Sequence, residues 1–311
     1  MTTALRQGSP ALSFSSRSSR SARKPLSTRE IALIRTLGCF RYLTTPQAAE
    51  LLFAGSRLNA RSADVVAARL LAGLRREGLV TTNAHQAGQP DAAPTRVVHF
   101  LTAAGRRAFV RCEPDAPRRR AAVGGSVLVS HSLMLADVAL AFRRSALEHV
   151  GHELERWDCD WQIGQKLAGT QVVPDAYLIY TTSRHKLHSF VEADRGTEGS
   201  RFFSGKILRY LDLHASGRWR GSLAVWPLTL TLTPTERRAF ELCAATAVAL
   251  SSRPDAPPAS AFRFAPVDDV RGRGPLNRIW FAPARRGRQG IAELPDGSDF
   301  PLDADRAGDA S

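Results

Sequence analysis

The sequence SADVVAARLLAGLRREGLVTT, residues 62–82, carries the pattern of a long helix that runs directly into a strand. Val66, Leu70 and Leu74 recur at every fourth position, which predicts one buried stripe along a helix over residues 62–77. Gly78 is the residue type that commonly ends a helix, and the residues after it favour a strand over 79–82. We therefore expect a helix–strand unit at the centre of a first domain.

Two shorter helices are expected before this unit and one strand after it. A capping-box pattern at residues 27–30 starts a first helix that ends near Gly38. Thr45 is expected to cap a second helix, because Pro46 suits the first turn. Residues 97–101 predict a strand that returns along the first one. Three helices followed by a two-stranded hairpin is the element order of a winged-helix domain.

The third helix of such a domain enters the major groove of DNA. Arg69 and Arg76 are seven positions apart and share one side of this helix, and Arg61 and Arg75 lie close to that side. His85 is expected in the hairpin loop, where it would approach the DNA backbone. The alternative is a small helical domain that makes protein contacts.

Composition favours a polyanionic partner. The chain has 311 residues, enough for about two domains, and 43 Lys and Arg against 29 Asp and Glu give a formal net charge of +14. This excess points to DNA before membrane, although a merely solvated basic surface would give the same count. Four scattered cysteines without a C-x-x-C motif indicate a reducing compartment. No apolar run reaches the ~18 residues of a membrane span, so we expect a cytoplasmic protein without membrane contact.

The second half predicts the order α-β-β-β-α-β-α. The expected elements are a helix over 130–149, strands near 154–161, 172–180 and 189–193, a helix over 198–213, a strand over 222–226 with or without continuation through 228–232, and a helix after the capping box Thr233-Pro234-Thr235-Glu236.

Three acids lie at the ends of two of these strands. Asp175 opens one strand, while Glu192 and Asp194 close the next. Since residues two apart in a strand face the same side, Glu192 and Asp194 are expected to project together, and Asp175 joins them if the strands pair. Three carboxylates at one point repel one another unless a cation is present, and their oxygens suit Mg²⁺ or Mn²⁺. Turn capping, or pairing with Arg195, is the structural alternative.

Lys206 follows on the next helix, between Phe203 and Tyr210 on one side. A charge on a packed side needs a partner, which a nearby carboxylate or phosphate would supply. The alternative is a side chain whose stem packs while its ammonium group reaches water.

Several of these segments resemble the replication-relaxation family of plasmid and mobile-element proteins. They are VPD at 173–175, FVEADRGTE at 190–198, KILRY at 206–210 and HSL at 131–133. The resemblance spans roughly residues 28–250 and includes the helical first domain. Its most specific part is E-x-D-R-G-T-E followed by K-x-x-x-Y.

The resemblance implies a role in plasmid replication, DNA relaxation or mobilisation, with DNA and other replication or mobilisation proteins as partners. The second half is similar to the PD-(D/E)xK nuclease fold, in which Asp175 would match the first acid and Glu192 the second. That motif has lysine where this chain has Asp194, and Lys206 could fill the vacated space from the next helix.

Two functions follow from this resemblance. If the domain is active, Asp175, Glu192 and Asp194 hold Mg²⁺ or Mn²⁺ for phosphodiester hydrolysis, while Lys206 orients the water or stabilises the developing charge. The alternative is a non-enzymatic winged-helix regulator or accessory factor with an inactive nuclease-like domain.

We therefore expect an α+β or α/β protein in which a winged-helix domain precedes a restriction-endonuclease-like domain. The expected parts are a disordered basic arm over 1–26, the winged helix over 27–111, a linker over 112–127, the nuclease-like domain over 128–250 and a partly disordered extension over 251–311.

Overall fold

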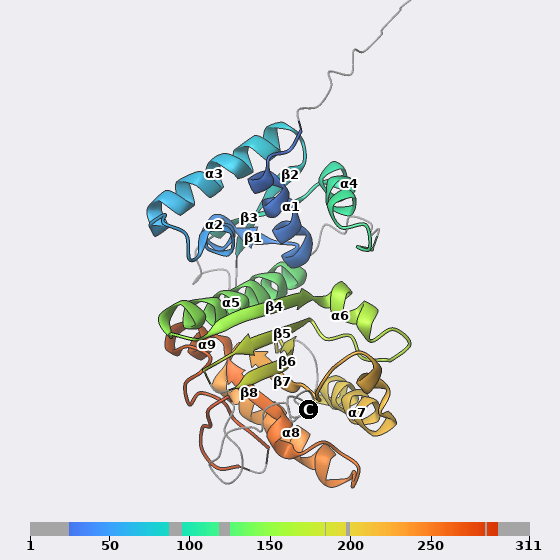
Figure 1. Ribbon diagram of the computed structural model, residues 1–311. Helices are drawn as coiled ribbons and strands as arrows, with labels where there is room; N and C mark the ends of the chain where they lie inside the picture. The colour runs from blue at the N-terminus through green and yellow to red at the C-terminus, as the bar shows by residue number, and fades with distance from the viewer. Residues whose placement is uncertain are drawn as a thin grey trace, which may run out of the picture.

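The computed structural model describes residues 25–86, 95–117, 125–183, 185–196, 200–283 and 285–291. Within them the chain forms a mixed α and β structure with two separate sheets, as predicted (Figure 1). The predictions for the basic arm, for the arginine run at 118–120 and for the acidic end of the chain concern residues outside the described ones.

The N-terminal part has the predicted order of three helices and a hairpin, with an added short strand and a fourth helix. Its elements are α1 (Thr28–Phe40), β1 (Leu43–Thr44), α2 (Thr45–Phe53), α3 (Ala60–Arg76), β2 (Val80–Gln86), β3 (Thr95–Leu101) and α4 (Ala103–Cys112). Strands β2 and β3 pair antiparallel, and β1 joins the outer side of β3. His85 lies within β2 and not in the loop, which corrects the sequence-based placement.

Helix α1 begins as predicted and ends later. Ser27 and Glu30 form both hydrogen bonds of the capping box. The helix continues past Gly38 to Phe40, and Gly38 has a packing role instead. A Cβ atom at Gly38 would lie only 2.3 Å from the ring of Phe109, so glycine allows α4 to approach α1 closely.

Two further helix details differ from the predictions. Thr44 caps α2 and Gln47 completes its capping box, one residue before the predicted cap. In α3 the fully buried side is made by small residues and two leucines: Ala63, Ala67, Leu71 and Leu74. Of the predicted stripe, Leu74 is buried, whereas Val66 and Leu70 are half-buried at its flank.

The second part contains the predicted order α-β-β-β-α-β-α, with a short helix inserted after the first strand and a short 3₁₀ helix before the last strand of that order. Its elements are α5 (Ser126–Glu148), β4 (Glu153–Cys159), α6 (Asp160–Lys166), β5 (Ala176–Thr181), β6 (Lys186–Ala193), α7 (Ser200–Ser216), η1 (Arg218–Gly221), β7 (Leu228–Thr233), α8 (Glu236–Ser251), η2 (Ala259–Ala261), β8 (Phe262–Pro266) and α9 (Val267–Arg273). Residues 222–226 form no strand, and Thr235 caps α8 in place of Thr233, with Pro234 ahead of the helix.

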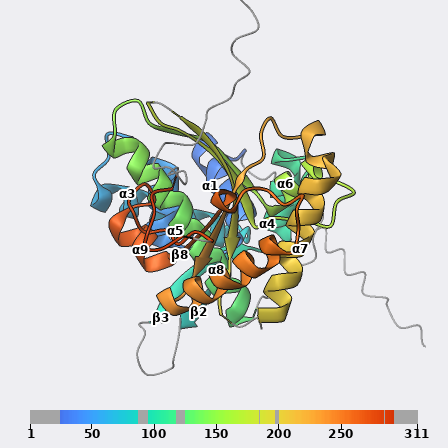
Figure 2. The same cartoon turned by 90° about the horizontal axis from the view of Figure 1, so that it is seen from below.

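The five strands lie in the order β4-β5-β6-β7-β8. The first three pair antiparallel, and β7 and β8 are parallel to β6. Helices α5 and α9 cover one face, while α6, α7 and α8 cover the other (Figure 2). Because both faces are covered, every residue of β7 is buried.

Helix α5 joins the two parts. Ala136 and Ala139 belong to the core of the N-terminal part, while Val138 and Phe142 belong to the core against the sheet. By length and composition α5 could cross a membrane, but its packing on two sides is that of a core helix. Ala116, inside the predicted linker, is also buried in the first core.

Candidate functional site

The ends of β5 and β6 bring two of the predicted acids together. Ala176 pairs with Val191, so Asp175 and Glu192 lie opposite each other where the strands meet. Lys206 and Tyr210 reach them from α7, and His131 reaches them from α5. We call His131, Asp175, Glu192, Lys206 and Tyr210 the acid–lysine cluster.

Both carboxyl oxygens of Glu192 are engaged. The Lys206 ammonium group pairs with Oε2, and the Tyr210 hydroxyl donates to Oε1. The Glu192 side chain is 3% exposed and that of Lys206 is 27% exposed. Lys206 therefore has a carboxyl partner at its place on the packed side of the helix.

Asp175 is held at the neighbouring position. Its Oδ2 accepts a hydrogen bond from the backbone N–H of Ala193 at 2.9 Å and lies 3.1 Å from Nε2 of His131. These contacts tie β5 to the end of β6 and to α5, so Asp175 has one fixed position between the two layers.

The cluster balances its own charge. Burial raises the pKa of Glu192 to about 8, even though Lys206 opposes this shift. Burial also acts to raise the pKa of Asp175, but Lys206 and His131 outweigh it and hold that pKa below its usual range. Burial and the nearby Glu192 raise the pKa of Tyr210. The cluster therefore holds one carboxylate, one ammonium group and one carboxyl that keeps its proton over much of the neutral range.

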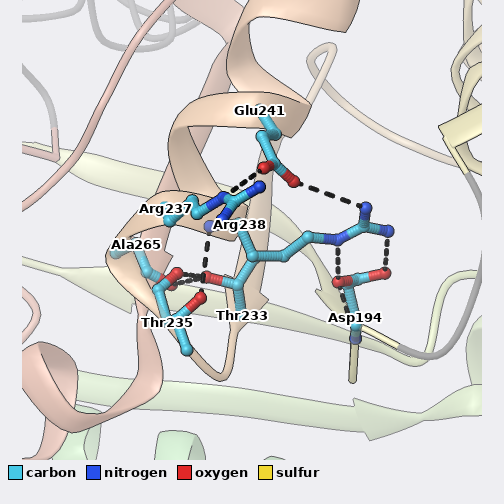
Figure 3. A network of polar contacts seen from close by, with 8 residues as sticks. Asp194, Thr233, Thr235, Arg237, Arg238, Glu241 and Ala265 are labelled. Atoms are coloured by element: carbon cyan, nitrogen blue, oxygen red, sulfur yellow. Dashed lines mark hydrogen bonds and ion pairs between the residues drawn. The ribbon is translucent and has the colours of Figure 1, made fainter.

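Asp194 lies apart from this cluster, which corrects the expectation that it projects with Glu192. Strand β6 ends at Ala193, so the alternation of side chains stops before Asp194. Arg238 of α8 donates to both Asp194 oxygens, at 2.8 and 3.0 Å (Figure 3). The backbone N–H of Gly196 also donates to Asp194, at 3.0 Å. The ion pair is nearly buried and joins the end of β6 to α8. The expected alternative partner, Arg195, instead donates to the carbonyl of Val127.

The described residues do not assemble the predicted Mg²⁺ or Mn²⁺ ligands. In this part of the chain, no group of three or more His, Cys, Asp or Glu is placed to hold a metal ion. Glu192 is engaged by Lys206 and Tyr210, and Asp194 by Arg238. Lys206 supplies the positive charge that the three-carboxylate prediction assigned to a metal. The cavity beside His131 and Asp175 measures about 60 Å³, too small for a nucleotide.

The predicted DNA-contacting arginines occupy the outer side of α3. Arg61, Arg69, Arg75 and Arg76 are all exposed, and no described residue forms an ion pair or hydrogen bond with their guanidinium groups. We call these four residues the arginine face. His85, predicted to accompany them, is 4% exposed, and its Nε2 lies 3.1 Å from the Ser130 hydroxyl on α5. Burial lowers the pKa of this ring, which packs against α5.

Two members of the cluster were not predicted as site residues. Both carry a signal in the sequence: His131 opens the HSL segment, and Tyr210 ends the K-x-x-x-Y spacing. Tyr210 lies four positions after Lys206, and residues four apart share one side of a helix. A polar residue at that position is therefore a candidate partner for Glu192, the residue that Lys206 contacts.

The protein is therefore a mixed α and β protein with an exposed arginine face and a buried acid–lysine cluster. The family model described as replication-relaxation matches residues 34–229, from α1 into β7. The chain belongs to the replication-relaxation family, which points to a role in plasmid or mobile-element replication or relaxation. No curated protein and no solved structure shows a significant match.

Proposed function

We propose that this protein binds duplex DNA through α3 of a winged-helix domain. It would then act as a replication or relaxation factor of a plasmid or mobile element. The second domain is proposed to be a nuclease-like scaffold that does not cut DNA. The observation that carries the DNA-binding proposal is the arginine face, whose four guanidinium groups have no described partner.

The geometry of α3 suits a groove. At about 100° per residue, the four arginines spread over roughly one third of the helix circumference, and at 1.5 Å per residue they extend over about 22 Å. The exposed side chains between them are short, namely Val65, Ala68 and Ala72. Short side chains allow the helix backbone to come near base edges while the arginines reach phosphates on either side.

The charge balance of the acid–lysine cluster favours a scaffold. A metal ion would have to displace Lys206 from Glu192, and the third predicted ligand, Asp194, is already bound to Arg238. The strand order β4-β5-β6-β7, with α7 between the last two strands, agrees with the PD-(D/E)xK core. This topology supports nuclease ancestry. The carboxyl oxygens of Glu192 and Asp194 are already bound within the protein, which supports a structural role for these two residues.

Metal-dependent nicking is the second candidate. It is favoured by the meeting of Asp175, Glu192 and Lys206 at one point, with Asp175 ionised. For cleavage, Lys206 would have to leave Glu192 as a metal ion enters.

DNA binding is tested by fluorescence anisotropy with labelled duplex over a range of salt concentrations. The comparison is between the wild type and a variant with Arg61, Arg69, Arg75 and Arg76 all replaced by alanine. The slope of log affinity against log salt should shrink by about 0.9 for each lost phosphate contact, together with a marked loss of affinity. Arg237→Ala on α8, also a highly exposed arginine, is the matched control. Unchanged binding by the fourfold variant would exclude α3 as the DNA-binding helix.

Nicking is tested on supercoiled plasmid with Mg²⁺ or Mn²⁺. We expect the wild type to bind the plasmid and leave it supercoiled. Nicking by the wild type that is absent in Glu192→Gln would select the second candidate, because glutamine preserves the shape of the side chain and removes its charge.

A further inference from the structure

A large pocket lies between the two parts of the molecule, away from the acid–lysine cluster. It measures about 730 Å³ and is bounded by α1, β3, α4 and the start of α6. Both views place α4 and α6 on the same side of the molecule (Figures 1 and 2). Four aromatic residues line it: Tyr42, Phe100, Phe109 and Trp161. The volume falls within the roughly 300–1,000 Å³ of small-molecule sites, which often form between domains.

The wall formed by α4 is rigidly placed. Phe109 packs over Gly38 of α1, as described above. At the other end of α4, a Cβ atom at Gly105 would lie 2.0 Å from the carbonyl oxygen of Leu79. The backbone of α4 is therefore in direct contact with the backbone at Leu79. Phe109 also meets Trp161 of α6 edge-on, with 6.3 Å between ring centres. The pocket therefore exists before any ligand enters it.

The charges around this aromatic floor are mostly positive. Arg41, Arg106, Arg107 and Arg111 line the pocket together with one acid, Asp160. Asp160 is paired with Arg41, and Arg106 donates to the carbonyl of Leu101 at 2.9 Å. Arg107 and Arg111 are one helical turn apart on α4 and exposed, and the described residues offer them no ion pair or hydrogen bond. Two adjacent guanidinium groups of this kind suit a phosphate.

Two further features mark the pocket as a binding site. The indole N–H of Trp161 is buried and has no hydrogen-bond partner in the described structure, which is unusual for a buried polar group. Arg41 adopts φ 69° and ψ −52°, and the N–H of Tyr42 donates to the carbonyl of Phe40 at 2.9 Å. This is a γ-turn, a strained conformation in which the packing around the pocket holds a residue other than glycine.

We propose that this pocket binds a nucleotide. The base would stack on the aromatic floor, while its phosphate would lie on Arg107 and Arg111. The same chemistry is presented by a free deoxynucleotide and by an unpaired 5′ end of DNA. The proposal does not rest on duplex binding by α3.

The test is calorimetric titration of the full chain with each of the four deoxynucleoside 5′-monophosphates, a 5′-phosphorylated single-stranded oligonucleotide and inorganic phosphate. Tryptophan fluorescence is followed in parallel. We expect at least one nucleotide or the oligonucleotide to bind and to quench fluorescence. Arg107→Ala/Arg111→Ala should weaken binding about tenfold or more, as loss of charged hydrogen bonds does. Arg237→Ala should bind like the wild type. In Trp161→Phe the quenching should shrink.

The outcomes separate the ligand sources. Binding of mononucleotides indicates a free nucleotide, whereas binding of the oligonucleotide alone indicates a DNA end. Phosphate binding as tight as nucleotide binding would overturn the role of the aromatic floor. The proposal also fails if nothing binds, or if the double variant binds like the wild type. The fourfold α3 variant should keep nucleotide binding, so loss of duplex binding and loss of this site are distinguishable.

Discussion

The arginine face and the acid–lysine cluster place charge in opposite ways. On α3 the four arginines are exposed and lack described partners, whereas Glu192 and Lys206 satisfy each other with little exposure. Exposed like charges add little to folding and remain available to a polyanion. Buried charges must be compensated within the fold, so their first role is structural. The contrast assigns binding to one region and stability to the other, and each prediction below tests that division.

The largest effect is expected for Glu192→Ala. This change leaves the ammonium group of Lys206 and the hydroxyl of Tyr210 without their shared acceptor in a nearly dry site. The free energy of unfolding should fall by about 3–5 kcal/mol, as when one partner of a buried pair is removed. Urea denaturation measures it. Glu113→Ala, which breaks the more exposed pair with Arg35, is the control and should cost about 1 kcal/mol or less. Equal losses in the two variants would show that the cluster is not a structural centre.

The pH dependence of stability should carry the signature of Glu192. Its pKa is about 8 in the folded protein, above the ordinary range of glutamate near 4.3, so the folded state binds this proton more tightly. The resulting stability is fully present at about pH 4 and is lost as the pH rises through about 8. Relative to Glu192→Gln, the wild type should lose on the order of 2–4 kcal/mol between about pH 5 and about pH 9. Parallel pH curves for the two proteins would mean that the folded carboxyl titrates in its ordinary range.

Asp194→Ala should have a smaller effect. It removes the carboxylate that holds Arg238 of α8 with two hydrogen bonds, and the guanidinium group remains largely buried. A loss of about 2 kcal/mol is expected from urea denaturation. The same substitution also tests the metal hypothesis: addition of Mg²⁺ should leave the Tm of the wild type and the variant unchanged. A rise in Tm that only the wild type shows would restore Asp194 as a metal ligand.

The fold was predictable where local signals agree with packing. The capping box at Ser27, the length of α3 and the order of strands around the acids follow from residue type and spacing. Gly38 was misjudged because the sequence shows a helix-ending residue, while the deciding contact is Phe109, 71 positions away in the chain. Contacts between distant segments are not encoded in spacing.

The candidate site shows the same limit. Asp175, Glu192 and Lys206 could be placed together because paired strands and the following helix meet at one edge. Asp194 could not be assigned, because its partner, Arg238, lies on a helix 44 positions further along the chain. His85 was misplaced for a related reason: its burial depends on α5, which belongs to the other part of the molecule.

The smallest effects are expected on α3 itself, and their signs differ. Arg61 lies in the first turn of α3, where a positive charge opposes the helix dipole, whereas Arg75 lies in the last turn, where it is favourable. Arg61→Ala should therefore raise the free energy of unfolding by about 0.3–0.5 kcal/mol, and Arg75→Ala should lower it by a similar amount. Both should weaken duplex binding and reduce its salt dependence. Arg61 would then be a residue that costs stability and serves binding. A destabilised Arg61→Ala with unchanged duplex affinity would reverse that assignment and make the arginine face a part of the fold.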